Sequence, residues 1–429
     1  MMYDLIAVGG GAAGFYGAIH VALANPSLKV AILEQSKQVL GKVRISGGGR
    51  CNVTHAEFNP AELTKAYPRG QKELRGPFNH YQPRHTIDFF ESRGIKLKVE
   101  EDGRMFPVSD SSQTIIDCFM DCVKTSGIEL IKNTPVIKIS PLEDPTGEGA
   151  WEVQTQSRSF ICKNLLVATG NSQRMWNILK TLGHRVIDPV PSLFTFNIKD
   201  ERIDGLQGLS TPARIELVSR ELPGKRISEV IKTTSKRSEG LMAEGPLLIT
   251  HWGMSGPAVL KLSSWGARLL HDYNYRFRIR VNWLPDYHQH GMYSFLEKVK
   301  DVEGKRTVYR TCPVEIPRRL WGKLVLSTGI TPEQKWAELT KKQLQSLAGQ
   351  LTASEFLVEG KSTFKEEFVT AGGVDLKEVN FKTYESKLHR GLYFAGEVLN
   401  IDAITGGYNF QNAWTGAYMA AHAITSEEK

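Results

Sequence analysis

The alternation of apolar and polar positions is clearest in the first thirty-four residues. Leu5-Ile6-Ala7-Val8 is a short apolar run typical of a buried strand, and a glycine cluster follows it at once. Small and apolar residues then continue at helical spacing to about Ala24, and Asn25-Pro26-Ser27 predicts a turn. Residues 29–33 form a second apolar run that ends at Glu34. This pattern predicts a βαβ unit.

The stretch from residue 41 to residue 188 continues as a mixture of helical and strand patterns. It predicts Gly-rich and Pro-containing loops over 41–80, helices near 84–93 and 111–125, strands around 128–139 and 151–155, a hairpin loop at 141–149, a buried strand at 165–168 and a helix ending at Gly183.

The pattern changes after Gly183. Residues 189–250 alternate short β-prone runs with Gly/Pro turns, and Tyr275–Trp283 alternates apolar and polar residues without a break, as in a half-buried strand. Its arginines, Arg276, Arg278 and Arg280, form either a binding surface or, more commonly, a solvated face. Residues 316–350 are helical in pattern, and the character of the first domain returns at about Gly360, ending in a helix over 411–425.

The order of these elements predicts an α/β fold with a discontinuous main domain. We expect a Rossmann-type dinucleotide-binding domain over 1–188 and 360–429, a β-rich insertion over 189–315 and a small helical subdomain over 316–359. A chain of 429 residues exceeds the usual size of a single core, which agrees with this division.

Composition narrows the class of protein further. Lys and Arg exceed Asp and Glu by 54 to 46, a net charge of +8, which either attracts an anionic partner or only solvates the surface and holds cofactor phosphates. We favour the second reading because no dense Lys/Arg run occurs. Five cysteines suit neither a disulfide framework nor zinc, and the sequence shows no secretory signal or membrane span. We therefore predict a cytoplasmic protein with no metal and no membrane contact.

The glycine cluster after the first strand carries the first chemistry. Gly9-x-Gly11-x-x-Gly14 follows a strand, opens a helix and precedes Glu34 by twenty residues, which is the full context of a dinucleotide fingerprint. Gly9 permits the turn, Gly11 lets a pyrophosphate approach the backbone, and Gly14 lets helix and strand pack closely. Glu34 would accept hydrogen bonds from ribose hydroxyls, which argues against NADP at this site. A fortuitous glycine turn would lack this context.

Two further glycine-rich segments favour FAD over NAD. Ser46-Gly47-Gly48-Gly49 is too rich in glycine to pack through side chains, as expected where backbone lies against a flat ligand. Residues 391–397 form a strand ending in Gly396-Glu397, and residues 406–409 open the last helix, whose N-terminus would face the flavin. Alone, this last segment would be read as a glycine-rich helix start with core aromatics.

Taken together, these motifs resemble the BaiN/HI0933-like family of FAD-dependent oxidoreductases, also labelled aminoacetone-oxidase-like. The resemblance covers nearly the whole chain and implies a flavin-binding domain split by a β-barrel-like insertion with a helical piece. The chain departs from the family after Ala168-Thr169-Gly170, where the usual longer Gly/Thr-rich stretch is shortened. The motifs that carry the resemblance are residues 9–14, 46–54, 101–107, 168–170, 251–258, 369–374 and 396–414.

The candidate site residues follow from these motifs. Arg50, Cys51 and Tyr408 are the candidate catalytic residues, and His251 is a further possible proton donor; for each, packing or flavin positioning is an equal alternative. The residues that we assign to the cofactor are Gly9, Gly11, Ala12, Ala13, Gly14, Glu34, Gln35, Lys42, Ser46, Gly47, Gly48, Gly49, Arg50, Cys51, Asn52, Val136, Ala168, Thr169, Gly170, Gly396, Glu397, Asp402, Gly407, Tyr408 and Asn409.

Three functions stay open at this point. The first is a flavin reductase for a small organic substrate, with NAD(P)H as a transient visitor because only one dinucleotide fingerprint occurs. The second is an oxidase that passes electrons from an amine-type substrate to oxygen. The third, ranked last, is a nucleic-acid-binding flavoprotein; we expect no nucleic-acid partner, because the aromatics beside Arg276–Arg280 point to the opposite face.

Overall fold

The chain folds into two compact units. The computed structural model describes residues 2–142, 149–218, 241–362 and 369–426. The first unit contains Met1–Val190 and Lys365–Lys429, and the second contains Pro191–Phe364. The first unit is therefore discontinuous, as the sequence pattern indicates. The separation of residues 316–359 as a subdomain of their own stays a prediction.

A parallel sheet forms the centre of the first unit. The predicted βαβ unit is confirmed, because β1 and β2 pair in parallel with Leu5 opposite Val30, and β9 pairs in parallel on the other side of β1. Leu5, Ile6 and Ala7 are fully buried, as in a strand covered on both faces. The strand order is β19-β20-β21-β9-β1-β2-β6, with β8 paired to β9 and β7 paired to β8. The strands are β1 (Met2–Val8), β2 (Val30–Leu33), β6 (Glu129–Ile131), β7 (Val136–Leu142), β8 (Ala150–Thr155), β9 (Ser159–Val167), β19 (Val379–Asn380), β20 (Glu385–Ser386) and β21 (Leu392–Phe394).

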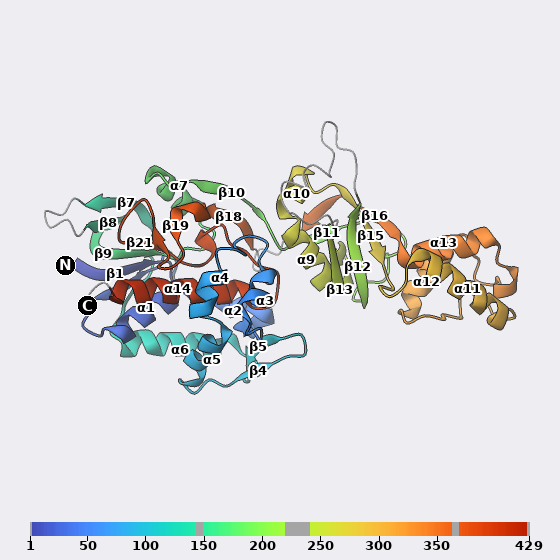
Figure 1. Ribbon diagram of the computed structural model, residues 1–429, viewed down its shortest axis with the longest axis horizontal. Coiled ribbons are helices and arrows are strands. Elements are labelled where there is room, and N and C mark those ends of the chain that lie inside the picture. The colour runs from blue at the N-terminus through green and yellow to red at the C-terminus, as the bar shows by residue number, and fades with distance from the viewer. Residues whose placement is uncertain (1, 143–148, 219–240, 363–368, 427–429) are drawn as a thin grey trace. The chain divides into compact units, whose positions relative to one another are not determined.

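Helices cover this sheet, and α1 and α14 lie side by side against each other (Figure 1). The helices predicted near 84–93 and 111–125 are confirmed as α5 and α6. Residues 41–80, predicted as loops, contain short helices instead, which lack the apolar repeat that would reveal them. Of the predicted hairpin loop, residues 141 and 142 belong to β7, and 143–148 lie outside the described residues. The helices are α1 (Ala12–Ala24), α2 (Gly41–Gly49), α3 (Pro60–Leu63), α4 (Arg75–His80), α5 (Pro83–Glu91), α6 (Ser112–Thr125), α7 (Gln173–Thr181) and α14 (Tyr408–Ser426).

Two small sheets complete the first unit. The three-stranded sheet β3-β5-β4 is antiparallel and lies beside the start of α14, and β10 pairs with β18. Their strands are β3 (Thr54–His55), β4 (Leu97–Val99), β5 (Arg104–Pro107), β10 (Val186–Pro191) and β18 (Thr370–Val374).

The second unit is built on a seven-stranded sheet that curls into a barrel. Its order is β16-β15-β12-β13-β14-β11-β17. Only Glu359 separates β16 from β17, so these two strands form one chain segment. That segment pairs with β15 through Val358, opposite Phe277, and with β11 through Gly360, opposite Asn197, which closes the sheet on itself. The predicted barrel-like insertion is thereby confirmed. The strands are β11 (Thr195–Asn197), β12 (Ser210–Val218), β13 (Met242–Thr250), β14 (Gly253–Ser255), β15 (Phe277–Asn282), β16 (Ser354–Val358) and β17 (Gly360–Ser362).

Helices of the second unit share one hydrophobic core with this sheet. The core contains Trp321 and Leu347 from helices together with Ile279 and Phe356 from strands. In the described part of residues 189–315, which the sequence pattern predicted as β-rich, the chain also forms α9, α10 and α11, so that prediction was incomplete. Across the part of the chain that the structure describes, no helix combines the length and apolar character needed to cross a membrane. The helices are α9 (Pro257–Trp265), α10 (Ala267–Asp272), α11 (Gln289–Glu303), α12 (Arg318–Leu326) and α13 (Lys341–Thr352).

Candidate flavin site

The turn between β1 and α1 has the geometry that dinucleotide binding requires. Gly9 has φ +112°, and a Cβ there would lie 2.5 Å from the Ala168 carbonyl oxygen. A Cβ on Gly14 would lie 1.9 Å from the Gly9 carbonyl oxygen, so only glycine lets helix and strand pack this closely. At Gly11, by contrast, no described atom lies within 4 Å of an added Cβ. The backbone at Gly11 is therefore open to a ligand, and the α1 N-terminus has no side-chain cap.

Glu34 lies at the end of β2, beside this turn. Its Oε2 accepts from the Gly10 N–H at 2.7 Å, and its Oε1 accepts from the N–H and hydroxyl of Ser36 at 2.8 and 2.7 Å. Val136, at the start of β7, is buried. Two residues before it, the Thr134 N–H donates to the Glu34 carbonyl at 2.8 Å, which holds this segment beside Glu34. Gln35 is exposed. The predicted adenosine-binding residues are thus brought together at one end of the turn.

Residues from distant parts of the chain meet at the N-terminus of α1. Lys42 forms an ion pair with Glu397, whose other carboxylate oxygen accepts from the Thr370 N–H at 2.9 Å. Gly396 has φ +74°, and a Cβ there would lie 3.3 Å from the Cβ of Ala13. The strand-end glycine therefore lies against the first turn of α1, as expected if one ligand contacts both.

The SGGG loop forms a tight left-handed turn at the end of α2. Gly47, Gly48 and Gly49 have φ values of +59°, +69° and +86°, a region that favours glycine. A Cβ at Gly47 would lie 2.7 Å from the Phe106 ring, whereas a Cβ at Gly48 or Gly49 would meet no described atom within 4 Å. Two of the three glycines therefore present open backbone, which is consistent with a flat ligand above them.

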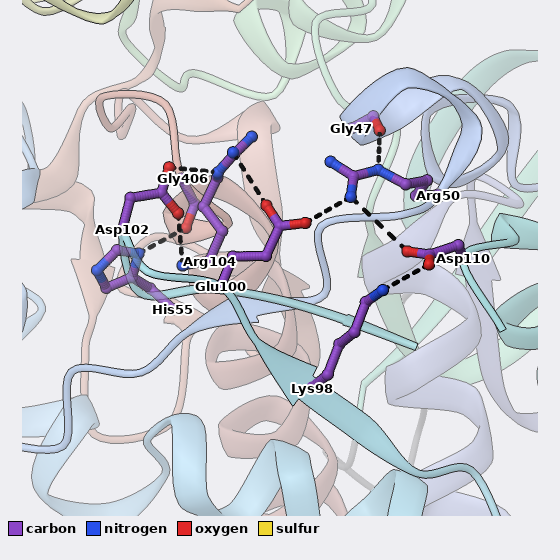
Figure 2. Close-up of polar contacts among 9 residues, drawn as sticks. All are labelled: Gly47, Arg50, His55, Lys98, Glu100, Asp102, Arg104, Asp110 and Gly406. Atoms are coloured by element: carbon purple, nitrogen blue, oxygen red, sulfur yellow. Dashed lines mark hydrogen bonds and ion pairs between the residues drawn. The ribbon is translucent and has the colours of Figure 1, made fainter. Parts of the chain in front are cut away.

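A network of charged side chains ties this loop to the β4–β5 hairpin (Figure 2). The Arg50 guanidinium donates to Glu100 at 2.5 Å and to the Gly47 carbonyl at 3.3 Å, and it lies over the Phe106 ring at 4.0 Å. Glu100 also accepts from Arg104 at 3.0 Å. Arg50 therefore holds the loop in place, which is the positioning alternative for this candidate; a catalytic role stays untested.

The same network includes three further charged residues that the sequence pattern did not single out individually. Asp110 lies 3.7 Å from Arg50 and 2.5 Å from Lys98, and Asp102 pairs with Arg104 at 2.7 Å. The motif at residues 101–107 thereby acquires a role, because it forms the hairpin against which the loop is held. Its separation of about fifty residues from the loop concealed this contact.

Cys51 and Asn52 continue the loop inward. Cys51 has φ +64° and is fully buried, and burial raises the pKa of its thiol to about 12. The structure therefore gives no support to a catalytic Cys51, since a reactive thiolate needs a low pKa and access. The Asn52 amide is also buried; its oxygen accepts from the Gly407 N–H at 2.9 Å when its nitrogen faces the carbonyls of Thr54 and Met105.

The start of α14 lies directly against this loop. A Cβ on Gly407, where φ is +89°, would lie 2.5 Å from the Thr54 carbonyl. The Asn409 side chain accepts from the Ala403 N–H at 3.0 Å and donates to the Ala403 carbonyl at 3.2 Å, which closes the preceding turn. Asp402 is fully buried in an ion pair with Arg69, so this predicted cofactor residue supports the turn from within. The two glycine-rich segments thus form one surface.

His55 is a site residue that the sequence reasoning missed. Its ring stacks on Tyr408 with centroids 4.4 Å apart, and its Nδ1 bonds to the Gly406 carbonyl at 3.0 Å. Burial lowers the pKa of His55, so the ring is neutral at pH 7. Burial also raises the pKa of Tyr408 to about 12, which keeps its phenol protonated. His251, the other possible donor, belongs to the second unit.

The residues present fit an FAD molecule. Open backbone at Gly11, a carboxylate at the end of β2 and open backbone at Gly48 and Gly49 match the pyrophosphate, the adenosine and the ring system in turn. Beside the Gly9 turn, the Thr169 hydroxyl is buried without a hydrogen-bond partner in the described structure. A bound ligand would supply such a partner. Contact of each assigned residue with the cofactor stays a prediction.

Comparison with known proteins agrees with this geometry. Residues 3–423 match the family described as HI0933-like protein Rossmann domain. The chain belongs to the HI0933-like family. It is an FAD-dependent oxidoreductase, as its resemblance and its site both indicated. The solved 3-ketosteroid-Δ4-(5α)-dehydrogenase of Rhodococcus jostii RHA1 is similar in fold, with a TM-score of 0.50 at 10% identity over 99% of this chain and 97% of that one.

Curated relatives of this family member cover nearly its whole length. The ribosomal RNA dihydrouridine synthase of Haemophilus influenzae is 28% identical over 98% of both chains, and the enzyme of the same name from Escherichia coli is 27% identical over 98% of both. The 3-dehydro-bile acid Δ(4,6)-reductase of Clostridium scindens is 25% identical over 97% of both.

Proposed function

We propose that this enzyme is an NAD(P)H-dependent reductase of a carbon–carbon double bond conjugated with a carbonyl group. The observation that carries the proposal is the flavin cradle itself, with open backbone at Gly11, Gly48 and Gly49. The sequence holds a single Gly-x-Gly-x-x-Gly fingerprint, so the nicotinamide is expected as a transient visitor. The names of the relatives narrow the acceptor. Dihydrouridine is uridine with a saturated ring bond, and a Δ(4,6)-reductase saturates ring bonds conjugated with a 3-oxo group.

In this proposal the chain binds and orients, and the cofactor supplies the redox chemistry. FAD, when bound, exchanges a hydride at N5 with a donor and then with an acceptor. Open backbone at Gly11 and the α1 N-terminus would hold the pyrophosphate, and Glu34 would hold the adenosine ribose. Loop 46–54 and the start of α14 would support the ring system. We assign Tyr408 as the candidate proton donor, because its phenol stays protonated and is partly exposed.

An anaerobic titration tests the electron donor. NADH or NADPH is added to the purified yellow protein, and flavin absorbance is followed until it bleaches. The reduced protein is then mixed with an unsaturated ketone or with uridine-containing RNA, and reoxidation is expected with one of them. A flavin that neither nicotinamide bleaches, or that only oxygen reoxidises, would contradict the reductase and favour the amine-type oxidase.

A second candidate acceptor is a uracil ring within RNA rather than a free small molecule. Two relatives are named for that reaction on ribosomal RNA, and the net charge of +8 suits a polyanionic substrate. The two candidates share the chemistry of the reduced double bond and differ in what surrounds it. Our expectation that nucleic acid is not a partner therefore stays an open prediction, which the acceptor arm of the titration decides.

A further inference from the structure

The excess positive charge of this protein is concentrated in one segment of the second unit. The helical segment, residues 289–352, runs from the first residue of α11 to the last residue of α13. It contains eleven Lys and Arg against six Asp and Glu, a net charge of +5 out of the +8 of the whole chain. No more than two of these cations are adjacent in sequence, which is why no basic run is visible.

The loop between α11 and α12 holds its cations on a rigid backbone. The Val308 carbonyl accepts from the buried Trp321 indole at 2.9 Å, and the Val308 N–H donates to the Gln334 carbonyl at 3.0 Å. The Arg306 carbonyl accepts from the Trp336 N–H at 3.0 Å. The backbone around residues 306–308 is therefore held by the core, while the side chains beside it point to solvent.

The charged side chains of this loop are available to a partner. Lys305 and Arg310 are exposed, and in the described parts of the chain neither forms an ion pair or side-chain hydrogen bond. Arg306 pairs with Glu303 at 3.0 Å but keeps 69% of its side chain exposed, so the pair is weak. Tyr309 lies among these cations with 39% exposure.

Four cations occupy the first turns of α12 and α13, where a positive charge does not stabilise a helix. Arg318 and Arg319 open α12, and Lys341 and Lys342 open α13, with no acidic residue in either first turn. A helix N-terminus carries partial positive charge, so cations there are repelled and anions are favoured. Arg319 donates to the Gly205 carbonyl, so it has a partner within the fold. Arg318, Lys341 and Lys342 are exposed and gain no helix stability from their positions, which suits attraction of an anionic partner.

We propose that the helical segment is a docking surface for the phosphate backbone of RNA, with Lys305, Arg306 and Arg310 contacting phosphates and Tyr309 offering a ring to a base. The choice of RNA rests on the second candidate of the proposed function. The apolar faces of α11, α12 and α13 are buried in the core shared with the sheet. The large apolar side chains that these helices leave exposed are the isolated Val302 and Leu326, which do not form the continuous apolar face that a lipid surface requires. Basic side chains with an interleaved aromatic are the footprint of a nucleic-acid partner.

The test compares two triple variants of the full-length flavoprotein. One carries Lys305→Gln, Arg306→Gln and Arg310→Gln; the control carries Lys124→Gln, Lys138→Gln and Lys382→Gln, three exposed cations of the first unit. Binding of a fluorescein-labelled oligouridine is measured by anisotropy over a series of salt concentrations. Each lost phosphate contact lowers the salt slope by about 0.7 on single strands, so the first variant is expected to lose about 2 from the slope. The control is expected to match the wild type.

Several outcomes would overturn the proposal. These are equal weakening by both variants, no oligouridine binding by the wild type at low salt, and binding to vesicles of anionic phospholipid in preference to RNA. Flavin content and melting temperature of both variants show whether they are folded. Binding is read without any reduction step, so a failed nicotinamide titration would refute the reductase and leave this docking surface untouched. A normal nicotinamide titration with no RNA binding would refute the docking surface and leave the reductase untouched.

Discussion

Substitution of Gly11 separates cofactor binding from folding. Gly11 has φ −97° and ψ −169°, an extended conformation that alanine also adopts, and an added Cβ meets no described atom within 4 Å. Gly11→Ala should therefore change the free energy of unfolding of the cofactor-free protein by no more than about 1 kcal/mol. The methyl group occupies the space through which a pyrophosphate would approach the backbone.

The cost to FAD binding follows from the contacts that the methyl group prevents. A hydrogen bond from a backbone N–H to a charged phosphate contributes about 1.5–3 kcal/mol, and the helix N-terminus adds about 0.3–1 kcal/mol. Losing one such contact with part of the dipole term weakens binding by roughly 2–3 kcal/mol, or about 30- to 150-fold. Quenching of FAD fluorescence gives the dissociation constant, and thermal melting of the apoprotein gives the stability.

A matched variant makes this prediction sharper. Gly14→Ala places a Cβ 1.9 Å from the Gly9 carbonyl oxygen, so it should lower the melting temperature of the apoprotein before any cofactor is added. If Gly11→Ala binds FAD as tightly as the wild type, the phosphates do not lie where we place them. If both variants lose stability equally, the distinction between open and packed glycines is wrong.

Two further predictions concern the charge network and a buried histidine. Glu100→Gln, which removes the carboxylate shared by Arg50 and Arg104, should weaken FAD binding by about 0.5–1.5 kcal/mol. Asp102→Asn, whose side-chain hydrogen bonds in the described structure go to Arg104 and not to Arg50, should weaken the fluorescence-derived affinity less, and equal effects would refute loop positioning by Glu100. Burial lowers the pKa of His20 to about 3. Below pH 6.5 the imidazole is therefore protonated in the unfolded chain and still neutral in the folded chain. The free energy of unfolding falls as the pH drops toward 3, by up to about 1.4 kcal/mol per pH unit. Denaturant unfolding across this range should show a steeper loss of stability in the wild type than in His20→Gln, which keeps the contributions of the other titrating groups, and parallel curves would contradict it.

Local pattern was enough to predict the nucleotide-binding half of this protein. The strand, glycine turn, helix and second strand of residues 2–34 are contiguous, and each glycine has a reason within its own turn, as the contacts of Gly9 and Gly14 show. Strict alternation over 275–283 likewise predicted β15, because half-burial of a strand imposes a two-residue period. Resemblance extended this to the family and its cofactor.

The tertiary structure decided which distant residues act together. Arg50 and Glu100 are fifty residues apart, and Thr54 and Gly407 more than three hundred, so no periodic pattern could show that they touch. The short helices over 41–80 were missed because glycine-rich or brief helices have little apolar repeat to reveal them. The helices α9, α10 and α11 lie between strands of the second unit, and the β-prone runs around them dominated the sequence pattern. The concentration of charge in residues 289–352 also appears only once the helix bounds are known, because its cations are dispersed along this segment of the chain. Sequence determined the dinucleotide site through contiguous backbone requirements and, by resemblance, the cofactor, and folding determined the rest by bringing separated side chains into contact.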